Sequence, residues 1–278
     1  MEKEILNEMN DDALKKGLEL LSLASSGQDI TVRDDQVGFY WLLDTAKRFR
    51  KKDRFRLIDT GNLDPPQLQE LATAGVDLYT SDNARLDVEE IEIICKTFKK
   101  ERGIIAYFYY GALKTEDESD SLTLADLETL GRKGIYFHIS NREEERNLTD
   151  LTQLASSCKK GRSWLVYYHH GPLERPLIEL GGKGCWIHVS DKSVEGVEDT
   201  ELLLAITKSA RSAGTNFVYY VEKPLDIFSL AKIIKAGAVV LFKFSLFDFG
   251  SPLRHLERKA RKKKLDFRAS YLSSIFPL

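Results

Sequence analysis

Short runs of β-branched and aromatic residues alternate along the chain with amphipathic stretches of helical spacing. Eight such runs are predicted to be strands, and they form four pairs: 56–61 with 76–81, 106–111 with 135–140, 166–171 with 185–190, and 218–223 with 238–245. The first strand of each pair leads into a short helical stretch that closes on Gly75, Gly134, Gly184 or Gly237. A glycine just past a helix is the expected left-handed cap. The second strand leads into a longer amphipathic helix, near residues 86–102, 145–160, 199–213 and 251–264.

This pattern repeats four times. The serines that end the second strands, Ser81, Ser140, Ser190 and Ser245, are 59, 50 and 55 residues apart. Alternation of strand and helix indicates a parallel sheet with right-handed crossovers. Eight such units in about 225 residues suit a closed barrel, so we predict an α/β fold, a (β/α)8 TIM-type barrel with an internal fourfold repeat. The alternative is an open doubly wound sheet, which the absence of a Gly-x-Gly-x-x-Gly fingerprint disfavours.

Two helices are predicted to precede the barrel. The first covers about Glu2–Ala24, where apolar residues recur at helical spacing. The second begins at Thr31, whose hydroxyl pairs with Asp34 in the manner of a capping box, and runs to about Lys51. The expected organisation is therefore a helical extension over residues 1–52, packed on a barrel over residues 53–278.

Period-two alternation predicts which side chains enter the barrel. The apolar set of 135–140 alternates with Tyr136, His138 and Ser140, so that second set points inward. The same argument places three further groups inside: Trp186, His188 and Ser190; Asp77, Tyr79 and Ser81; and Leu241, Lys243 and Ser245.

The first strand of each pair allows two registers. One points Ile58, Phe108, Tyr168 and Tyr220 inward, below Thr60, Tyr110, His170 and Glu222. The other points Asp59, Tyr109, His169 and Val221 inward. The first register is preferred because Val221 suits the side that the helices cover.

The carboxyl ends of barrel strands are where catalytic groups gather. The candidate catalytic residues there are His170, Glu222, Lys243, His188 and His138, and the candidate ligand-binding residues are Tyr79, Tyr110, Tyr168 and Tyr220. The imidazoles with Glu222 could hold a single transition metal, but one ligand on each strand with no His-x-His pair is a weak signal. Lys243 could act as a base or a Schiff-base nucleophile, or it could pair with Glu222. Catalysis, metal and cofactor therefore stay open.

Composition and charge narrow the class of protein. The 278 residues include 41 basic and 43 acidic residues, for a net charge of −2, which gives no reason to expect nucleic acid as a partner. No apolar stretch is long enough for a membrane span, and the amino terminus resembles no signal peptide. The three cysteines, Cys95, Cys158 and Cys185, form no zinc or disulfide pattern. These features predict a cytoplasmic protein.

Basic residues cluster before the strands and acidic residues after them, so the barrel mouth is expected to be negative. We therefore expect a small neutral or cationic ligand in a polar lumen of His, Tyr, Glu and Lys, with acid–base or metal-assisted catalysis as one version of that function. The alternative is a non-catalytic scaffold or assembly component. Its charged faces and the apolar tail of residues 271–278 would contact a protein partner or a second copy of the chain.

Overall fold

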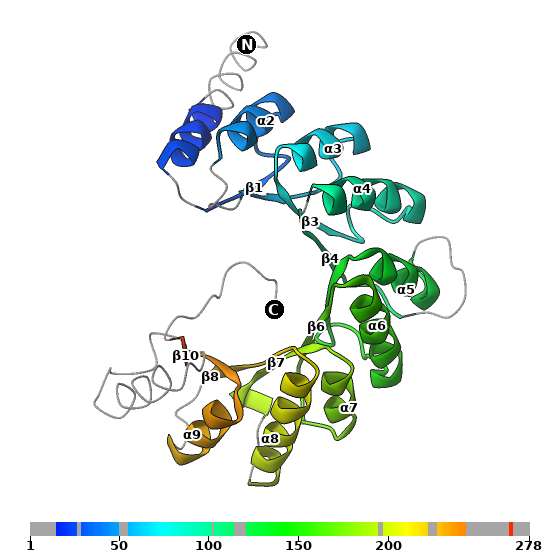
Figure 1. The fold of residues 1–278 in the computed structure, drawn as a ribbon, viewed down its shortest axis with the longest axis vertical. Coiled ribbons are helices and arrows are strands. Elements are labelled where there is room, and N and C mark those ends of the chain that lie inside the picture. The colour runs from blue at the N-terminus through cyan, green and yellow to red at the C-terminus, as the bar shows by residue number, and fades with distance from the viewer. Residues whose placement is uncertain are drawn as a thin grey trace, which may run out of the picture.

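The chain forms one parallel sheet whose strands follow one another in sequence order. The computed structural model describes residues 15–26, 29–49, 55–101, 103–113, 121–193, 197–221, 227–242 and 267–268. Within them, ten strands are hydrogen-bonded in the order β1 to β10, and each neighbouring pair is parallel. Figure 1 shows the sheet as an arc with the helices on its outer side.

The predicted alternation of strands and helices is confirmed. The strands are β1 Ile30–Arg33, β2 Phe55–Ile58, β3 Asp77–Ser81, β4 Ile105–Tyr109, β5 Tyr136–Ser140, β6 Leu165–His169, β7 Trp186–Ser190, β8 Phe217–Val221, β9 Val239–Phe242 and β10 Phe267–Arg268. The helices are α2 Phe39–Arg48, α3 Pro65–Thr73, α4 Val88–Lys100, α5 Leu124–Lys133, α6 Leu148–Gly161, α7 Pro176–Gly182, α8 Val197–Ser212 and α9 Ile227–Ala236, with a 3-10 turn η1 at Asp191–Ser193 and a further helix over residues 15–26. The eight predicted strands correspond to β2–β9.

Local sequence signals place the ends of the helices. Thr123 caps α5 by accepting a hydrogen bond from the Asp126 N–H, and the Asp126 carboxylate accepts one from the Thr123 N–H. Gly134 ends the same helix at φ 107°, a left-handed conformation that costs glycine little. The other three predicted cap glycines also have positive φ. Each helix therefore ends where the next strand must begin.

Side chains alternate between the two faces of the sheet. On β5, Phe137 and Ile139 are buried, whereas Tyr136, His138 and Ser140 are only half-buried. The buried pair belongs to the large apolar cluster that the strands share with the helices. The half-buried set therefore lies on the inner face, as the alternation predicts.

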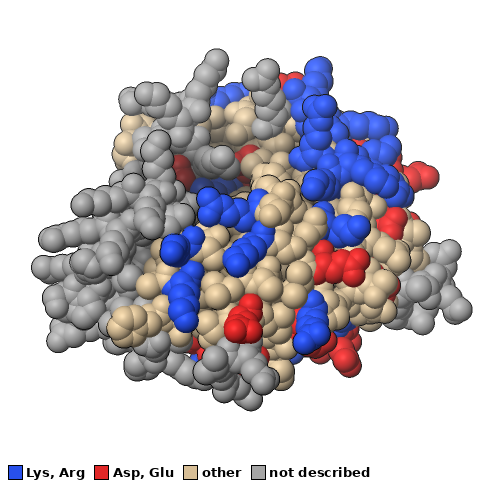
Figure 2. Space-filling view, turned by 60° about the horizontal axis from the view of Figure 1, so that its bottom comes forward, with Lys and Arg blue, Asp and Glu red and all other residues tan. Residues whose placement is uncertain are grey.

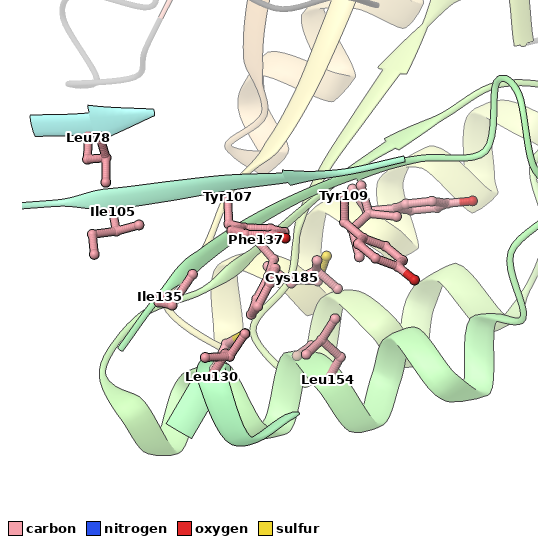
Figure 3. Packing of buried hydrophobic residues seen from close by; sticks show 14 of the residues in the cluster. Leu78, Ile105, Tyr107, Tyr109, Leu130, Ile135, Phe137, Leu154 and Cys185 are labelled. Carbon is pink, nitrogen blue, oxygen red and sulfur yellow. The ribbon is translucent and has the colours of Figure 1, made fainter. Parts of the chain in front are cut away.

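The apolar cluster fills the space between the sheet and the helix layer. Figure 3 shows Tyr107 and Phe137 reaching from the strands towards Leu130 of α5 and Leu154 of α6. The two rings meet at 5.7 Å with a 65° edge-on geometry. This outer layer holds most of the buried apolar side chains. The hydrophobic core of the protein therefore lies between the sheet and the helices, and the inner face of the sheet lies on the other side.

The ambiguous register of the remaining strands is resolved in favour of the preferred one. Tyr219 and Val221 of β8 belong to the cluster under the helices, whereas Tyr220 belongs to a separate small cluster with Val218 and Leu241. Tyr220 therefore lies on the inner face. The expectation that Val221 points towards the helices is confirmed.

The predicted helix from Thr31 is wrong at its start. Residues Ile30–Arg33 form β1, which pairs with β2, and α2 begins only at Phe39. The Asp34 carboxylate caps no helix here, because it accepts hydrogen bonds from the N–H and hydroxyl of Thr60. Ile30 and Val32 are buried while their neighbours are exposed, so the short strand did carry a period-two signal.

Ring closure, predicted for an eight-stranded barrel, is not seen in the part of the chain that the structure describes. There β1 pairs with β2 and β10 with β9, and no pairing joins the two ends of the sheet. Several predicted features lie outside the described residues: residues 2–14 of the first predicted helix, the boundary at residue 52, Ser245, the helix near 251–264 and the apolar tail 271–278. The domain division stays a prediction.

Candidate ligand cleft at the carboxyl ends of β6 to β8

Polar side chains that directly follow a strand hold the loop after the neighbouring strand. After β5, Asn141 Oδ1 accepts a hydrogen bond from the His170 N–H (2.7 Å), and Asn141 Nδ2 donates to the His170 carbonyl (2.8 Å). After β3, Asp82 Oδ2 accepts from the N–H groups of Tyr110 (2.8 Å) and Gly111 (2.7 Å). Asp34 holds Thr60 after β1 in the same way. These contacts fix the loops that form the rim of the sheet.

A cleft of about 400 Å³ opens beside the loop that follows β6. It is lined by Arg142, Tyr168, His169, His170, Gly171, His188, Val189, Ser190, Lys192, Ser193 and Tyr220. The floor comes from three adjacent strands, since Tyr168, His188 and Tyr220 lie on β6, β7 and β8. Gly171 has φ 103° and allows the sharp turn that brings His170 to the rim.

Aromatic and imidazole rings form a continuous row across the inner face, one from each strand between β3 and β8. Centroid distances along the row are 6.3 Å for Tyr79–Phe108, 4.5 Å for Phe108–His138, 6.0 Å for His138–Tyr168, 4.7 Å for Tyr168–His188 and 5.6 Å for His188–Tyr220. Strand register produces the contacts, because Phe108 pairs with His138 and Tyr168 with His188. The last three rings of the row form the floor of the cleft.

Each histidine of this row is hydrogen-bonded to a tyrosine on the next strand. His138 Nδ1 lies 3.0 Å from the Tyr168 hydroxyl, and His188 Nδ1 lies 2.7 Å from the Tyr220 hydroxyl. Burial lowers the pKa of both imidazoles to about 3, and the neighbouring His138 adds to the effect on His188. Burial also raises the pKa of Tyr168. At neutral pH the rings are therefore uncharged, and when the phenol donates to Nδ1, Nε2 carries the imidazole proton.

The structure gathers four of the nine predicted site residues in this cleft: His170, His188, Tyr168 and Tyr220. His138 lies one strand away, joined to the cleft through Tyr168. Tyr79 lies at the far end of the ring row, and Tyr110 holds the loop after β4 through Asp82, so neither borders the cleft. Glu222 and Lys243 lie outside the described residues.

Two cationic side chains of the cleft, Arg142 and Lys192, were missed in the sequence. Each follows a strand-ending serine by two positions, and its N–H donates to that serine's hydroxyl oxygen, Ser140 in one case and Ser190 in the other. Ser140 and Ser190 therefore act in the turns that follow β5 and β7. The recurrence of a basic residue two positions after the serine was the signal available in the sequence.

Charge is unevenly distributed over the helix ends. Basic residues occupy the last turns of several helices, namely Lys99 and Lys100 of α4, Arg132 and Lys133 of α5, and Lys159 and Lys160 of α6. Acidic residues occupy the first turns, namely Glu89 and Glu90 of α4, Asp126 of α5 and Asp150 of α6. Figure 2 shows Lys and Arg side chains gathered over one part of the surface. Both placements complement the helix dipole. The dipole alone therefore accounts for the separation of basic and acidic residues to opposite helix ends, and no ligand is needed to explain it.

The described ranges contain neither a cluster of metal-ligating side chains nor a membrane-spanning helix. No group of three or more His, Cys, Asp or Glu side chains there could hold a metal ion. Likewise, none of the described helices is long and apolar enough to cross a bilayer.

These observations define a parallel α/β protein of repeating strand–helix units with a polar cleft at the carboxyl ends of its strands. No family model and no curated protein matches the chain. Among solved structures, it is similar to a putative fructose-1,6-biphosphate aldolase from Coccidioides immitis (15% identity, 72% of this chain, 76% of that chain, TM-score 0.34). It is also similar to 3-dehydroquinate dehydratase from Enterococcus faecalis (14%, 79% and 98%, TM-score 0.33). A third is deoxyribose phosphate aldolase from Aeropyrum pernix (13%, 90% and 97%, TM-score 0.30). Likenesses at these TM-scores carry no conclusion about activity.

Proposed function

We propose that the cleft at the carboxyl ends of β6–β8 binds a small anionic molecule with a flat apolar part. The observation that carries this proposal is the composition of the lining. Two basic residues, Arg142 and Lys192, line the cleft together with His188. The acidic loops of the sequence favoured a neutral or cationic ligand, but short-range charge at the cleft favours an anion.

The floor of the cleft complements the flat part of such a ligand. Tyr168, His188 and Tyr220 present ring surfaces that could stack against a planar group. An uncharged imidazole whose Nδ1 is occupied by a phenol offers its Nε2–H as a hydrogen-bond donor. A carboxylate or similar group would accept that bond while it pairs with the cations at the rim.

The histidines of the ring row are better suited to binding a ligand than to transferring protons. A general acid or base works best when its pKa lies near the working pH, and burial keeps the pKa of His138 and His188 at about 3. We therefore assign His188, which lines the cleft, to ligand recognition, and His138 to positioning Tyr168 through their hydrogen bond. Catalytic roles for His170, Glu222 and Lys243 stay predictions, as does the single transition metal.

A pair of ligands with the same ring and opposite charge tests the proposal. Benzoate and benzylamine are titrated into the full-length protein while chemical shifts and heat are recorded. Benzoate should bind and benzylamine should not. Replacing Lys192 by Gln should weaken benzoate binding by roughly tenfold, equivalent to about 1.4 kcal/mol. Lys183→Gln, an exposed change at the carboxyl end of α7, should leave binding unchanged.

Two other outcomes would reject the proposal in different ways. If benzylamine binds and benzoate does not, the ligand is cationic, as the charge of the loops alone suggested. If neither binds, and no small anion from a wider panel binds, the inner face is a hydrogen-bonded structural layer and the scaffold function takes its place.

A further inference from the structure

Two buried arginines occupy matching places in the fold. Arg85 lies between β3 and α4, two positions before the cap residue Asp87, and Arg146 lies between β5 and α6, one position before the cap residue Asn147. Both residues are 7% exposed. A buried guanidinium needs partners for its five N–H donors and for its charge. The two sites meet that need differently.

Arg85 is neutralised by carboxylates of the chain itself. Its Nε donates to Asp59 Oδ2 (2.5 Å) and its Nη2 to Asp59 Oδ1 (3.0 Å), a bidentate pair. Nη1 pairs with Glu90, the third residue of α4, and Nη2 also donates to the Leu63 carbonyl (2.6 Å). Arg85 therefore has two carboxylate partners, and its four hydrogen bonds use four of its five N–H donors.

All hydrogen bonds of the Arg146 side chain among the described residues go to backbone carbonyl oxygens. Its Nε donates to the Ser140 carbonyl (2.9 Å), its Nη2 to that of Tyr110 (3.0 Å) and its Nη1 to that of Gly111. The guanidinium also lies over the Tyr109 ring, 6.0 Å from its centroid. Three hydrogen bonds leave two of its five N–H donors without a described partner.

The carboxylates that serve Arg85 have been replaced around Arg146. Tyr109, the last residue of β4, lies beside Arg146, whereas Asp59, the first residue after β2, lies beside Arg85, so an aromatic ring is present in one site and a carboxylate in the other. The third residue of α6 is Asp150, one methylene shorter than Glu90, and it makes no ion pair with Arg146 in the described structure. Burial lowers the pKa of Arg146, and the nearby charge of Glu144 offsets this only in part, with no ion pair between the two among the described contacts.

A second cleft, of about 320 Å³, lies against this incomplete arginine. Asn147, Leu148 and Thr149 bring the amino-terminal turn of α6 to it, which adds the positive end of a helix dipole. Two exposed carboxylates, Glu145 and Glu174, also line it. The cleft therefore offers a cationic wall and an anionic rim.

We propose that this second cleft binds a small zwitterion with a carboxylate and an ammonium group, such as a free α-amino acid. The ligand's carboxylate takes the place beside Arg146 that Glu90 fills beside Arg85, and its ammonium group pairs with Glu145 and Glu174. A simple carboxylate lacks the second contact and meets two like charges at the rim. The size of the cleft suits a small molecule of this kind.

The ligand's two charged groups can be tested apart. Glycine, acetate, methylamine and a panel of L-amino acids are titrated into the full-length protein by saturation-transfer NMR. At least one amino acid should bind, with acetate and methylamine each weaker by at least roughly tenfold. If acetate binds as well as the amino acids, or if nothing binds, the proposal is overturned.

A substitution that places a carboxylate of the protein itself beside Arg146 tests the proposal without removing the buried arginine. Asp150→Glu supplies a side chain of the length that reaches Arg85 in the other loop, so it should weaken amino-acid binding by at least roughly tenfold and raise the melting temperature. Unchanged binding in a variant whose melting temperature has risen would contradict the proposal. Lys192→Gln, in the first cleft, should leave amino-acid binding to the second cleft unchanged. The proposal for the second cleft can therefore fail or hold independently of the proposal for the first.

Discussion

The two faces of the sheet are made by the same strands but obey different requirements. On β5, Phe137 and Ile139 face the helices and are fully buried in apolar contacts, while His138 between them lies in a row of hydrogen-bonded rings. The outer face has to fill space, because gaps there cost packing energy. The inner face has to satisfy polar atoms, because an unpaired buried polar group is expensive. Stability should therefore depend mainly on the outer face, and ligand recognition on the inner one.

The largest expected effect comes from the outer face. Phe137→Ala should lower the free energy of unfolding by about 3–5 kcal/mol, because it removes a buried ring and leaves a cavity under α5 and α6. The neighbouring His138→Ala, on the other face of the same strand, should cost clearly less. Urea denaturation of both variants measures the difference. Equal losses would mean that the inner row contributes as much to stability as the core.

Acid should lower the stability of the protein through the two buried histidines of the inner face. The unfolded chain protonates histidine near pH 6.5, whereas the folded pKa of His138 and His188 is about 3. The stability that depends on their neutral form is complete above about pH 6.5 and is lost as the pH falls towards 3, by roughly 1.4 kcal/mol per pH unit for each histidine.

Unfolding free energies between pH 7 and 5 test this effect of acid. In a double variant, His138→Gln with His188→Gln, the free energy of unfolding should lose most of its dependence on pH. In Phe137→Ala the dependence on pH should be kept. A slope unchanged in the double variant would show that other groups cause the acid sensitivity.

The smallest effect should come from one ring of the row. His188→Gln keeps a polar side chain but disturbs the 2.7 Å contact with Tyr220, so it should cost about 0.5–1.5 kcal/mol. Tyr220→Phe should cost a similar amount, and the double variant should cost less than the two single losses added together. Denaturant titrations of the four proteins measure this coupling. Additive losses would mean that the contact contributes nothing to the folded state.

Local patterns in the sequence predicted much of the fold. Alternation and glycine caps located β2–β9, and the preferred register placed Tyr168 and Tyr220 correctly beside His188. The strand at Ile30–Arg33 was missed because Thr31 inside it, with Asp34 three residues later, resembled the capping box that begins a helix. The Asp34 contact that overrides this interpretation reaches a loop 26 residues away.

The sequence by itself determined the order of strands and helices and the face on which each β5 or β7 side chain lies, because both depend on local spacing. The tertiary structure decided the open order of the sheet in the described residues, the inclusion of Arg142 and Lys192 in the first cleft, and the loss of a carboxylate beside Arg146. These features depend on contacts between different strands and loops of the sheet. Whether a carboxylate reaches a guanidinium depends on distances of one methylene between segments far apart in the chain, which no local pattern encodes.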